Sequence, residues 1–350
     1  MDNATLSEPV ALAQAVSMAV TPVRGTQVDR ALKPLLHNGL REGARMKFGV
    51  STFLTDEGLR PDELAVALEE RGFDSLFVSE HTHYPVAAPP PPDTDLPQRD
   101  YLRSLDPFIA LSAAAMVTDR LTLGTGITLV VQRDPLTLAK EVATLDYLSG
   151  GRLQLGVGAG WLREEMVNHG TNPKTRMALM RERVLAMKQI WTQEQAEFHG
   201  EYVSFDPVYS WPKPTQRPHV PVLVGGNGPT VFNRVLEYGD GWAPNLPSTP
   251  EDLVADVAEL RRRGDDQGRS YIPVTLIGAD QRGFRGTERL NAIAPLNKHE
   301  LATLAEGGID HCLFFRNAAL SSAEALRYLD DLVELTEEFR GGADYAPAAS

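Results

Sequence analysis

Residues 133–161, RDPLTLAKEVATLDYLSGGRLQLGVGAGW, contain the pattern that decides the fold of this chain. A proline at position 135 suits the first turn of a helix, and apolar residues recur at helical spacing up to position 148. The pair Gly150-Gly151 ends that helix, because glycine adopts the left-handed conformation without steric cost. A short buried strand follows from Leu153. The stretch therefore predicts the alternation of helix and strand that is typical of α/β proteins.

The predicted strand leads into a turn that is rich in glycine, GVGAGW at 156–161. Such a turn presents backbone N–H groups beside a flat indole, which suits a phosphate or a planar ring system. Val157, Gly158, Gly160 and Trp161 are therefore candidates for cofactor binding. The alternative interpretation is a tight strand–helix turn that packs against a core tryptophan.

Strands and helices alternate from Met46 to about residue 340. The expected strands cover 46–52, 73–81, 120–129, 153–158, 221–226, 239–244, 272–278 and 309–315. Eight strand–helix units in about 295 residues have the size and order of a TIM barrel, a closed (β/α)8 fold. A doubly wound open sheet is the alternative. A hairpin at 198–207 and a proline-rich segment at 84–103, where we expect no regular element, are predicted insertions.

The ends of the chain differ in character from the predicted barrel. We expect residues 1–45 to be a mostly disordered N-terminal extension or the product of an upstream start codon, with a helical docking arm as the alternative, and residues 341–350 to be a disordered tail. The barrel domain is expected to cover 46–340. It begins with a strand at a methionine, which is common in cytosolic enzymes, so we expect a cytoplasmic protein.

Composition narrows the partners of this protein. The chain of 350 residues has a net charge of −13, which argues against nucleic acid. No apolar run reaches the roughly 20 residues of a membrane span. Cys312 is the single cysteine, so an internal disulfide and a thiolate metal cluster are excluded. We expect a small-molecule substrate, no nucleic-acid partner and no membrane partner, and we leave open a homodimer.

In a TIM barrel, the active site lies at the carboxyl ends of the strands. These ends carry few carboxylates, so paired acids for hydrolysis and a ligand set for a metal are both missing. Glu80 and His81 follow the second strand, and His81 is either a donor to cofactor or substrate or a satisfied structural histidine. Glu80 is either a catalyst or a buried acid satisfied by the backbone of the barrel. We interpret His83 as a loop anchor that faces away from His81.

Two further features suit an anion. The sequence GGNG at 225–228 ends the fifth strand before a helix, where barrels often hold phosphate. Lys174 and Arg176 begin a helix expected over 173–193, where cations oppose the helix dipole. That mismatch indicates an anionic partner, with solvated surface charge as the alternative. The same helix is expected to place Arg181, Glu182 and Lys188 on its outer face.

Six motifs in order resemble the bacterial luciferase-like superfamily. They are MKFG, SEH, GTGI, RDP with LSGGRLQLGVGAGW, the proline-rich run into PVLVGG, and GDGW, and together they span about 46–245. Within the superfamily, the chain is most similar to oxidoreductases that use the deazaflavin coenzyme F420. Some members that depend on FMN share several of these motifs.

The resemblance implies a TIM barrel with insertions and a cofactor at its mouth. It also implies a cis peptide bond at Gly126–Ile127, against which the deazaflavin ring would rest. The acid–histidine pair maps to Glu80 and His81, and the two glycine turns would line the ribityl and phosphate parts. Ala159 stands where related sugar-phosphate dehydrogenases have a catalytic glutamate, so the resemblance does not extend to that reaction.

These observations predict an enzyme that transfers hydride between coenzyme F420 and a small organic substrate. His81 would be the acid–base group, with Glu80 holding its orientation. Cations at Lys174, Arg176 and Arg181 would offset the repulsion between an acidic protein and the anionic tail of F420. The predicted cofactor-binding residues are Gly126, Ile127, Thr128, Val157, Gly158, Gly160, Trp161, Gly225, Gly226, Asn227, Gly228 and Arg176. The alternatives are an FMN-dependent luciferase-like monooxygenase and a flavin-binding protein without turnover.

Overall fold

The computed structural model describes residues 45–88, 98–247, 249–269, 271–285, 288–293, 296–316 and 320–340. All of them belong to one unit of the chain, Leu40–Ser350. The predicted extension, up to residue 44, and the predicted tail at 341–350 lie outside the described residues.

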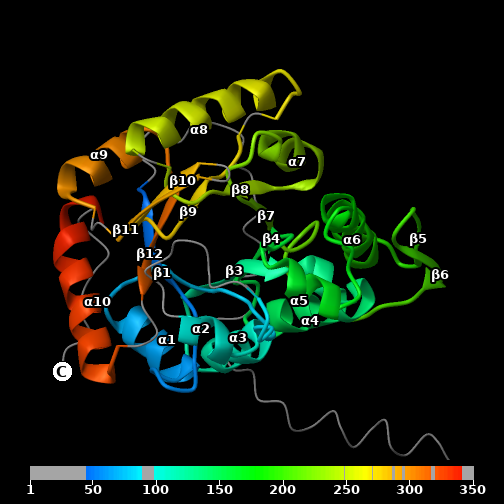
Figure 1. The fold of residues 1–350 in the computed structure, drawn as a ribbon, viewed down its shortest axis with the longest axis horizontal. Helices are drawn as coiled ribbons and strands as arrows, with labels where there is room; N and C mark the ends of the chain where they lie inside the picture. The colour runs from blue at the N-terminus through cyan, green and yellow to red at the C-terminus, as the bar shows by residue number, and fades with distance from the viewer. Residues whose placement is uncertain are drawn as a thin grey trace, which may run out of the picture. The chain divides into compact units, whose positions relative to one another are not determined.

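Eight parallel strands form the predicted barrel (Figure 1). They are β1 (Lys47–Thr52), β2 (Ser75–Val78), β3 (Thr122–Leu129), β4 (Leu153–Gly158), β7 (Val222–Gly225), β8 (Gly241–Ala243), β9 (Thr275–Ile277) and β12 (His311–Arg316). Their order in the sheet is β8-β7-β4-β3-β2-β1-β12-β9. Parallel bridges join Trp242 to Val274 and Asn245 to Ile277, so the two ends of the sheet meet. The TIM barrel is confirmed, and the open doubly wound sheet is wrong.

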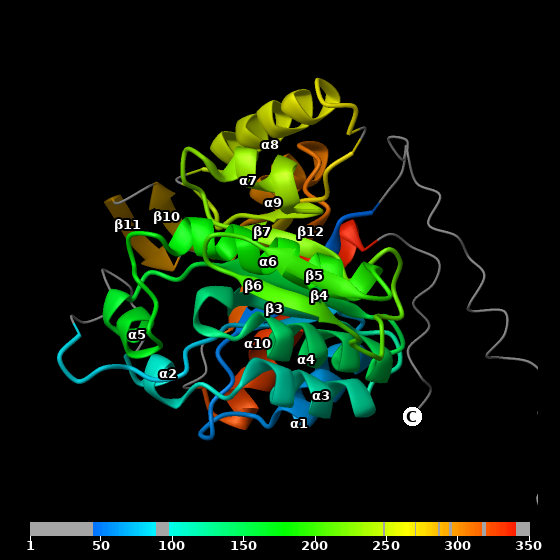
Figure 2. The same ribbon diagram turned by 90° about the vertical axis from the view of Figure 1, so that its right-hand side faces the viewer.

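A helix follows each barrel strand and covers its outer side. These helices are α1 (Pro61–Glu70), α3 (Pro107–Met116), α4 (Pro135–Leu148), α6 (Arg176–Thr192), α7 (Val231–Tyr238), α8 (Pro250–Asp265), α9 (Lys298–Glu306) and α10 (Ser322–Thr336). The helices α1, α3 and α4 pack side by side along one flank (Figure 2). Local signals start and stop α4 as predicted: Pro135 lies in its first turn, and Gly150 and Gly151 have φ of 66° and 84° after its end. Asp134 also caps this helix by accepting the Thr137 N–H.

Two layers of buried hydrophobic side chains stabilise the barrel. The larger layer lies between the strands and the helices and includes Phe48, Val142 and Leu155. A smaller cluster fills the barrel interior with Phe77, Ile277 and other apolar side chains. Alternate residues of a strand point to opposite faces, which is why β12 sends Leu313 to the interior cluster and Phe314 to the outer layer. The interior is therefore a packed core that supports a site at one end.

Several elements depart from the sequence prediction. The segment at 84–103 contains the short helix α2 (Gln98–Arg103), so its expected lack of structure is wrong there, and 89–97 lie outside the described residues. The helix α5 (Arg163–Asn168) and the hairpin of β10 (Gln281–Arg285) and β11 (Glu288–Ile293) were not predicted. The hairpin of β5 (Ala196–His199) and β6 (Ser204–Val208) is confirmed.

The placement of Glu182 on the outer face of α6 is wrong. Its side chain is buried and accepts the backbone N–H groups of Glu201, Tyr202 and Val203 at 2.7–2.9 Å. A buried carboxylate is stable where several N–H donors replace its water, so Glu182 fastens the turn between β5 and β6 to α6.

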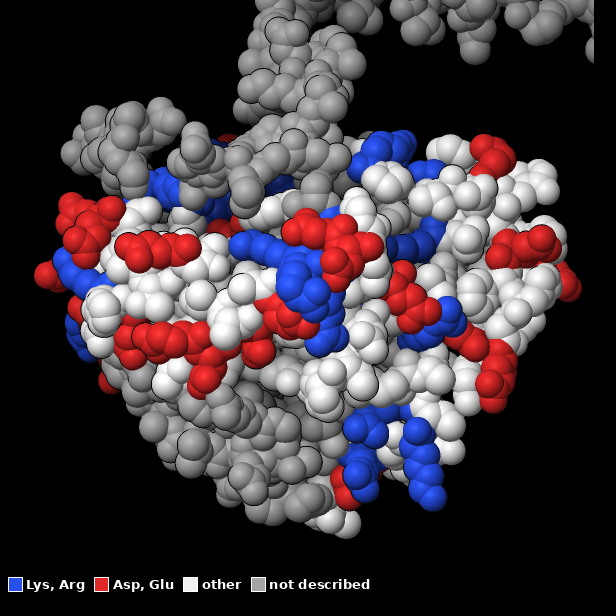
Figure 3. Space-filling view, turned by 90° about the horizontal axis from the view of Figure 1, so that it is seen from above, with Lys and Arg blue, Asp and Glu red and all other residues white. Residues whose placement is uncertain are grey.

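Charge on the surface is mixed. In the face drawn in Figure 3, acidic and basic side chains are interspersed. On α8, Glu259 pairs with both Arg262 and Arg263. No helix in the described part of the chain is both long and apolar enough to cross a membrane.

Candidate active site

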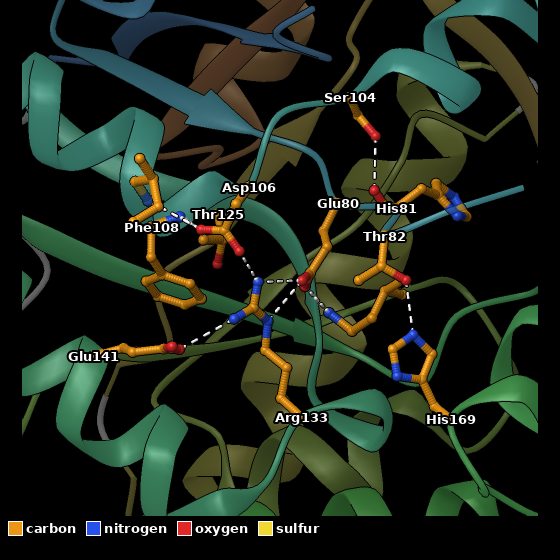
Figure 4. Close-up of polar contacts among 12 residues, drawn as sticks. Glu80, His81, Thr82, Ser104, Asp106, Phe108, Thr125, Arg133, Glu141 and His169 are labelled. Carbon is orange, nitrogen blue, oxygen red and sulfur yellow. Dashed lines mark hydrogen bonds and ion pairs between the residues drawn. The ribbon is translucent and has the colours of Figure 1, made fainter.

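His81 lies just beyond the carboxyl end of β2, and its contact with Ser104 is drawn in Figure 4. Several neighbours hold it in place. Its side chain is 5% exposed, and its Nδ1 lies 2.8 Å from Oε2 of the fully buried Glu165. Ser104 donates a hydrogen bond to its carbonyl oxygen. The rings of Tyr101 and Trp161 lie 4.9 and 5.9 Å from the imidazole, measured between centroids. Since Glu165 occupies Nδ1, and Nε2 has no hydrogen bond to the described residues, Nε2 is the nitrogen available for chemistry.

Glu165, on α5, is ionised by its surroundings. Burial acts to raise its pKa, but the hydrogen bond and charge of His81 and the N–H of Thr82 outweigh burial, so the pKa falls below its ordinary value. A carboxylate at this place keeps hydrogen on Nδ1 of His81 and stabilises the protonated ring. The prediction that Glu80 orients His81 is therefore wrong, because the carboxylate bound to His81 belongs to Glu165.

The lowered pKa of Glu165 makes part of the protein's stability depend on pH. A depressed carboxyl pKa contributes stability that is present above the ordinary value of 4.5 and is lost as the pH falls through the folded-state pKa. We expect Glu165→Gln to lower the free energy of unfolding by about 1.5–3 kcal/mol at pH 7. This difference should shrink below about pH 4. Urea unfolding between pH 3 and 7 measures it, and a difference independent of pH would contradict the assignment.

Glu80 instead belongs to a network around Arg133 (Figure 4). Its Oε1 accepts from Nε of Arg133 at 2.6 Å, and its Oε2 accepts the Leu129 N–H at 2.7 Å. Arg133 also pairs with Asp106 and Glu141, at 2.5 and 3.1 Å. Burial raises the pKa of Glu80 while the charge of Arg133 opposes that shift. The network ties the ends of β2 and β3 to α3 and α4, so Glu80 supports the loop that carries His81.

The end of β3 has the backbone feature that the resemblance implied. The peptide bond between Gly126 and Ile127 is cis, and the Gly126 carbonyl accepts a hydrogen bond from Ser79 at 2.9 Å. The Ile127 side chain packs with the interior cluster. Thr128 is buried, and its hydroxyl has no hydrogen-bond partner in the described structure.

The glycines divide into two groups. A Cβ on Gly158 or Gly225 would lie 2.6 or 2.9 Å from the Ile127 side chain, so these positions make room for Ile127. In contrast, a Cβ on Gly226 or Gly228 would meet nothing within 4 Å, and Gly226 has φ +101°. The space beside Gly226 and Gly228 is therefore open to a ligand, although the Gly226 N–H donates to the Ala243 carbonyl and the Gly226 carbonyl accepts from the Trp242 indole.

The other residues of these turns have structural contacts. Asn227 exchanges two hydrogen bonds with the backbone of Asn245, which joins the ends of β7 and β8. Val157 is fully buried, and Gly160 has φ +74°. Trp161 is half-buried in an aromatic cluster with Tyr84 and Tyr101, next to His81.

A cationic pocket lies among the residues that follow β4. It has a volume of about 370 Å³ and is lined by Arg163, Asn172, Pro173, Lys174 and Arg176. Arg176 donates to the Pro173 carbonyl at 2.7 Å, but its buried Nε has no partner in the described structure. Three cationic side chains around one hollow suit an anion with several charges.

The residues that line this pocket differ from the predicted set of cations in two ways. Arg181 is not among its lining residues, since its guanidinium pairs with Glu237 at 2.6 Å. Arg163 was missed, although it directly follows the glycine turn and Trp161 in sequence. Among the described residues, no group of three His, Cys, Asp or Glu side chains could hold a metal ion.

The buried histidine–glutamate pair lies at the end of the TIM barrel where the active sites of barrel enzymes are found. The chain belongs to the luciferase-like monooxygenase family, whose model matches residues 55–279. It is an oxidoreductase of the luciferase-like type.

Three comparisons illustrate the relationship. An uncharacterised protein of Mycobacterium tuberculosis is 45% identical over 216 residues, which are 60% of this chain and 75% of that protein. An F420-dependent glucose-6-phosphate dehydrogenase of Kineococcus radiotolerans is 32% identical over 67% of this chain and 68% of its own. The solved structure of an F420-dependent secondary alcohol dehydrogenase with an F420–acetone adduct has a TM-score of 0.68 at 20% identity, over 85% of this chain and all of that one, a likeness that concerns the fold alone.

Proposed function

We propose that this protein transfers hydride between coenzyme F420 and a small organic substrate, with His81 as the acid–base group. The observation that carries the proposal is the pocket formed by Arg163, Lys174 and Arg176. The tail of F420 continues past its phosphate into a lactyl and oligoglutamate chain, and a protein of net charge −13 repels such a tail unless local cations receive it. A related dehydrogenase that is named F420-dependent supports the same cofactor.

The described residues fit this cofactor at two places. The space beside Gly226 and Gly228 is open, so a phosphate or ribityl group would have room to approach there. The cationic pocket lies among residues that follow β4 and would hold the anionic tail. When bound, a deazaflavin supplies a hydride acceptor or donor at its C5 carbon.

The protein would supply binding, orientation and one proton position. His81 Nε2 takes a proton from the substrate during oxidation and returns it during reduction. Glu165 holds the ring by Nδ1 and stabilises its protonated form. The aromatic rings of Trp161 and Tyr101 beside His81 limit the access of water to this proton.

Parallel titration with F420 and FMN, at low and high salt, tests the cofactor. We expect tighter binding of F420, with an affinity that falls as salt rises, because charged groups near the surface are screened. Arg176→Ala should weaken the binding of F420 by about tenfold, which is the effect of removing one charge-assisted contact. It should weaken the binding of FMN by less. Arg181→Ala is the matched control, since Arg181 lies on the same helix outside the pocket lining, and it should leave both affinities unchanged.

The luciferase-like monooxygenase family model supports FMN chemistry with oxygen as the second candidate. Equal or tighter binding of FMN, unaffected by Arg176→Ala, would instead support an FMN-dependent monooxygenase. Tight F420 binding without hydride exchange to any substrate class would indicate a binding protein without turnover.

A further inference from the structure

The buried His81–Glu165 pair has to exchange protons with solvent. The His81 side chain is 5% exposed and that of Glu165 is not exposed at all. Under the proposed function, on which this inference rests, each turnover adds or removes one proton at this pair. A path from the pair to water is therefore part of the chemistry, and it has to begin at a polar contact of Glu165.

Glu165 makes that contact through its second oxygen. Oε2 is bound to His81, whereas Oε1 accepts the Thr82 backbone N–H at 2.8 Å and the Thr82 hydroxyl at 3.2 Å. Thr82 is exposed. Its hydroxyl is thus the contact that joins the buried carboxylate to the surface.

The Thr82 hydroxyl has two further neighbours, both histidines. His83 Nδ1 lies at 2.9 Å and His169 Nε2 at 2.7 Å, the latter drawn in Figure 4. Asn168 Nδ2 donates to His83 Nε2, so the hydrogen of neutral His83 sits on Nδ1 and points at the Thr82 oxygen. A hydroxyl has a single hydrogen. The hydrogen of the Thr82 hydroxyl can therefore be donated either to Glu165 or to His169.

His169 is suited to be the outer end of this path. It is exposed and lies at the carboxyl end of α5. Neighbouring protein atoms remove part of the water around its ring, and this desolvation lowers the pKa of His169. The charges of His83, Arg133 and Arg183 lower this pKa further, whereas the charge of Glu165 raises it. Neutral His169 has a lone pair on Nε2 that can accept a proton and release it to water.

We propose that Thr82 and His169 form a proton relay between the His81–Glu165 pair and solvent. A proton that arrives at His81 Nε2 displaces the one on Nδ1 to Glu165. The carboxyl group turns and gives that proton to Thr82 Oγ1, which passes its own hydrogen to His169 Nε2. No charge is created or lost overall, and the same hops in reverse supply a proton for reduction.

The relay is tested on the cofactor-free protein by the solvent exchange of the His81 Nδ1 proton, followed by NMR with ¹⁵N-labelled histidine. Thr82→Val removes the hydroxyl but keeps the side-chain shape and the backbone N–H to Glu165. We expect exchange to slow by at least about tenfold, the low end of the effect of a positioned proton-transfer group. Thr82→Ser keeps a hydroxyl and should restore the rate, so rescue separates the relay from a general loss of structure.

A matched pair of variants tests the direction of the path. His169→Gln should also slow exchange, whereas His83→Gln should not, although both histidines contact the same oxygen. Unchanged exchange in Thr82→Val, or equal effects at His83 and His169, would overturn the relay. The exchange measurement needs no F420, so it can be interpreted even if the proposed function is wrong. Conversely, a negative result for the relay would not change the outcome of the cofactor titration.

Discussion

Replacing His81 with alanine is expected to lower the maximal rate of hydride transfer by about 10²–10⁴-fold, the usual contribution of a general acid or base. F420 should still bind, because the cationic pocket is lined by residues on and before α5 and α6 rather than by His81. Steady-state rates and fluorescence titration of the same preparation separate the two effects. A change of less than about threefold in the maximal rate would remove His81 from the mechanism.

His83 provides the control for this prediction. It lies two residues away but contacts Thr82 and Asn168 rather than Glu165. His83→Ala should therefore change the rate far less than His81→Ala. Equal losses at both positions would mean that the loop as a whole, and not the His81 imidazole, is needed for turnover.

The barrel could be predicted because its signals are local. The proline in the first turn of α4 and the glycine pair after its end each act within a few residues of the helix end that they mark. The short helix α5 has only six residues, too few for a helical period to be recognised. The hairpin of β10 and β11 interrupts a strand–helix unit without any motif of its own.

The partners of the site residues could not be predicted because they are set by tertiary structure. Glu165 is 84 residues from His81 in sequence, and nothing in the pattern joins them. Glu80 precedes His81 directly, yet its side chain turns to Arg133. The adjacency of an acid and a histidine indicated the correct place on the barrel and the wrong carboxylate.

The glycine turns were likewise predictable in position but not in role. Their position at strand ends was readable from sequence, but a pattern of glycines does not say what fills the space they leave. At Gly158 and Gly225 that space is taken by Ile127, which favours the packing interpretation there. At Gly226 and Gly228 it stays open, and these two residues keep the ligand interpretation.

Removing Arg133 is expected to have the largest effect on stability. The Glu80 side chain is 2% exposed and Arg133 is 14% exposed, so Arg133→Ala leaves a buried carboxylate without its cation. Breaking one side of such a pair costs about 3–5 kcal/mol of the free energy of unfolding. Urea unfolding at pH 7 measures this loss.

Two variants show whether the cost comes from the uncompensated charge. Arg181→Ala breaks an exposed pair with Glu237 and should cost at most about 1 kcal/mol. The double variant Arg133→Met and Glu80→Leu removes both charges while keeping apolar volume, so it should recover much of the stability lost in Arg133→Ala. If the double variant is as unstable as the single one, the network acts through the hydrogen bonds to Leu129 and Asp106 rather than through charge. Recovery of stability would identify charge neutralisation of Glu80 as the main contribution of Arg133 to the fold.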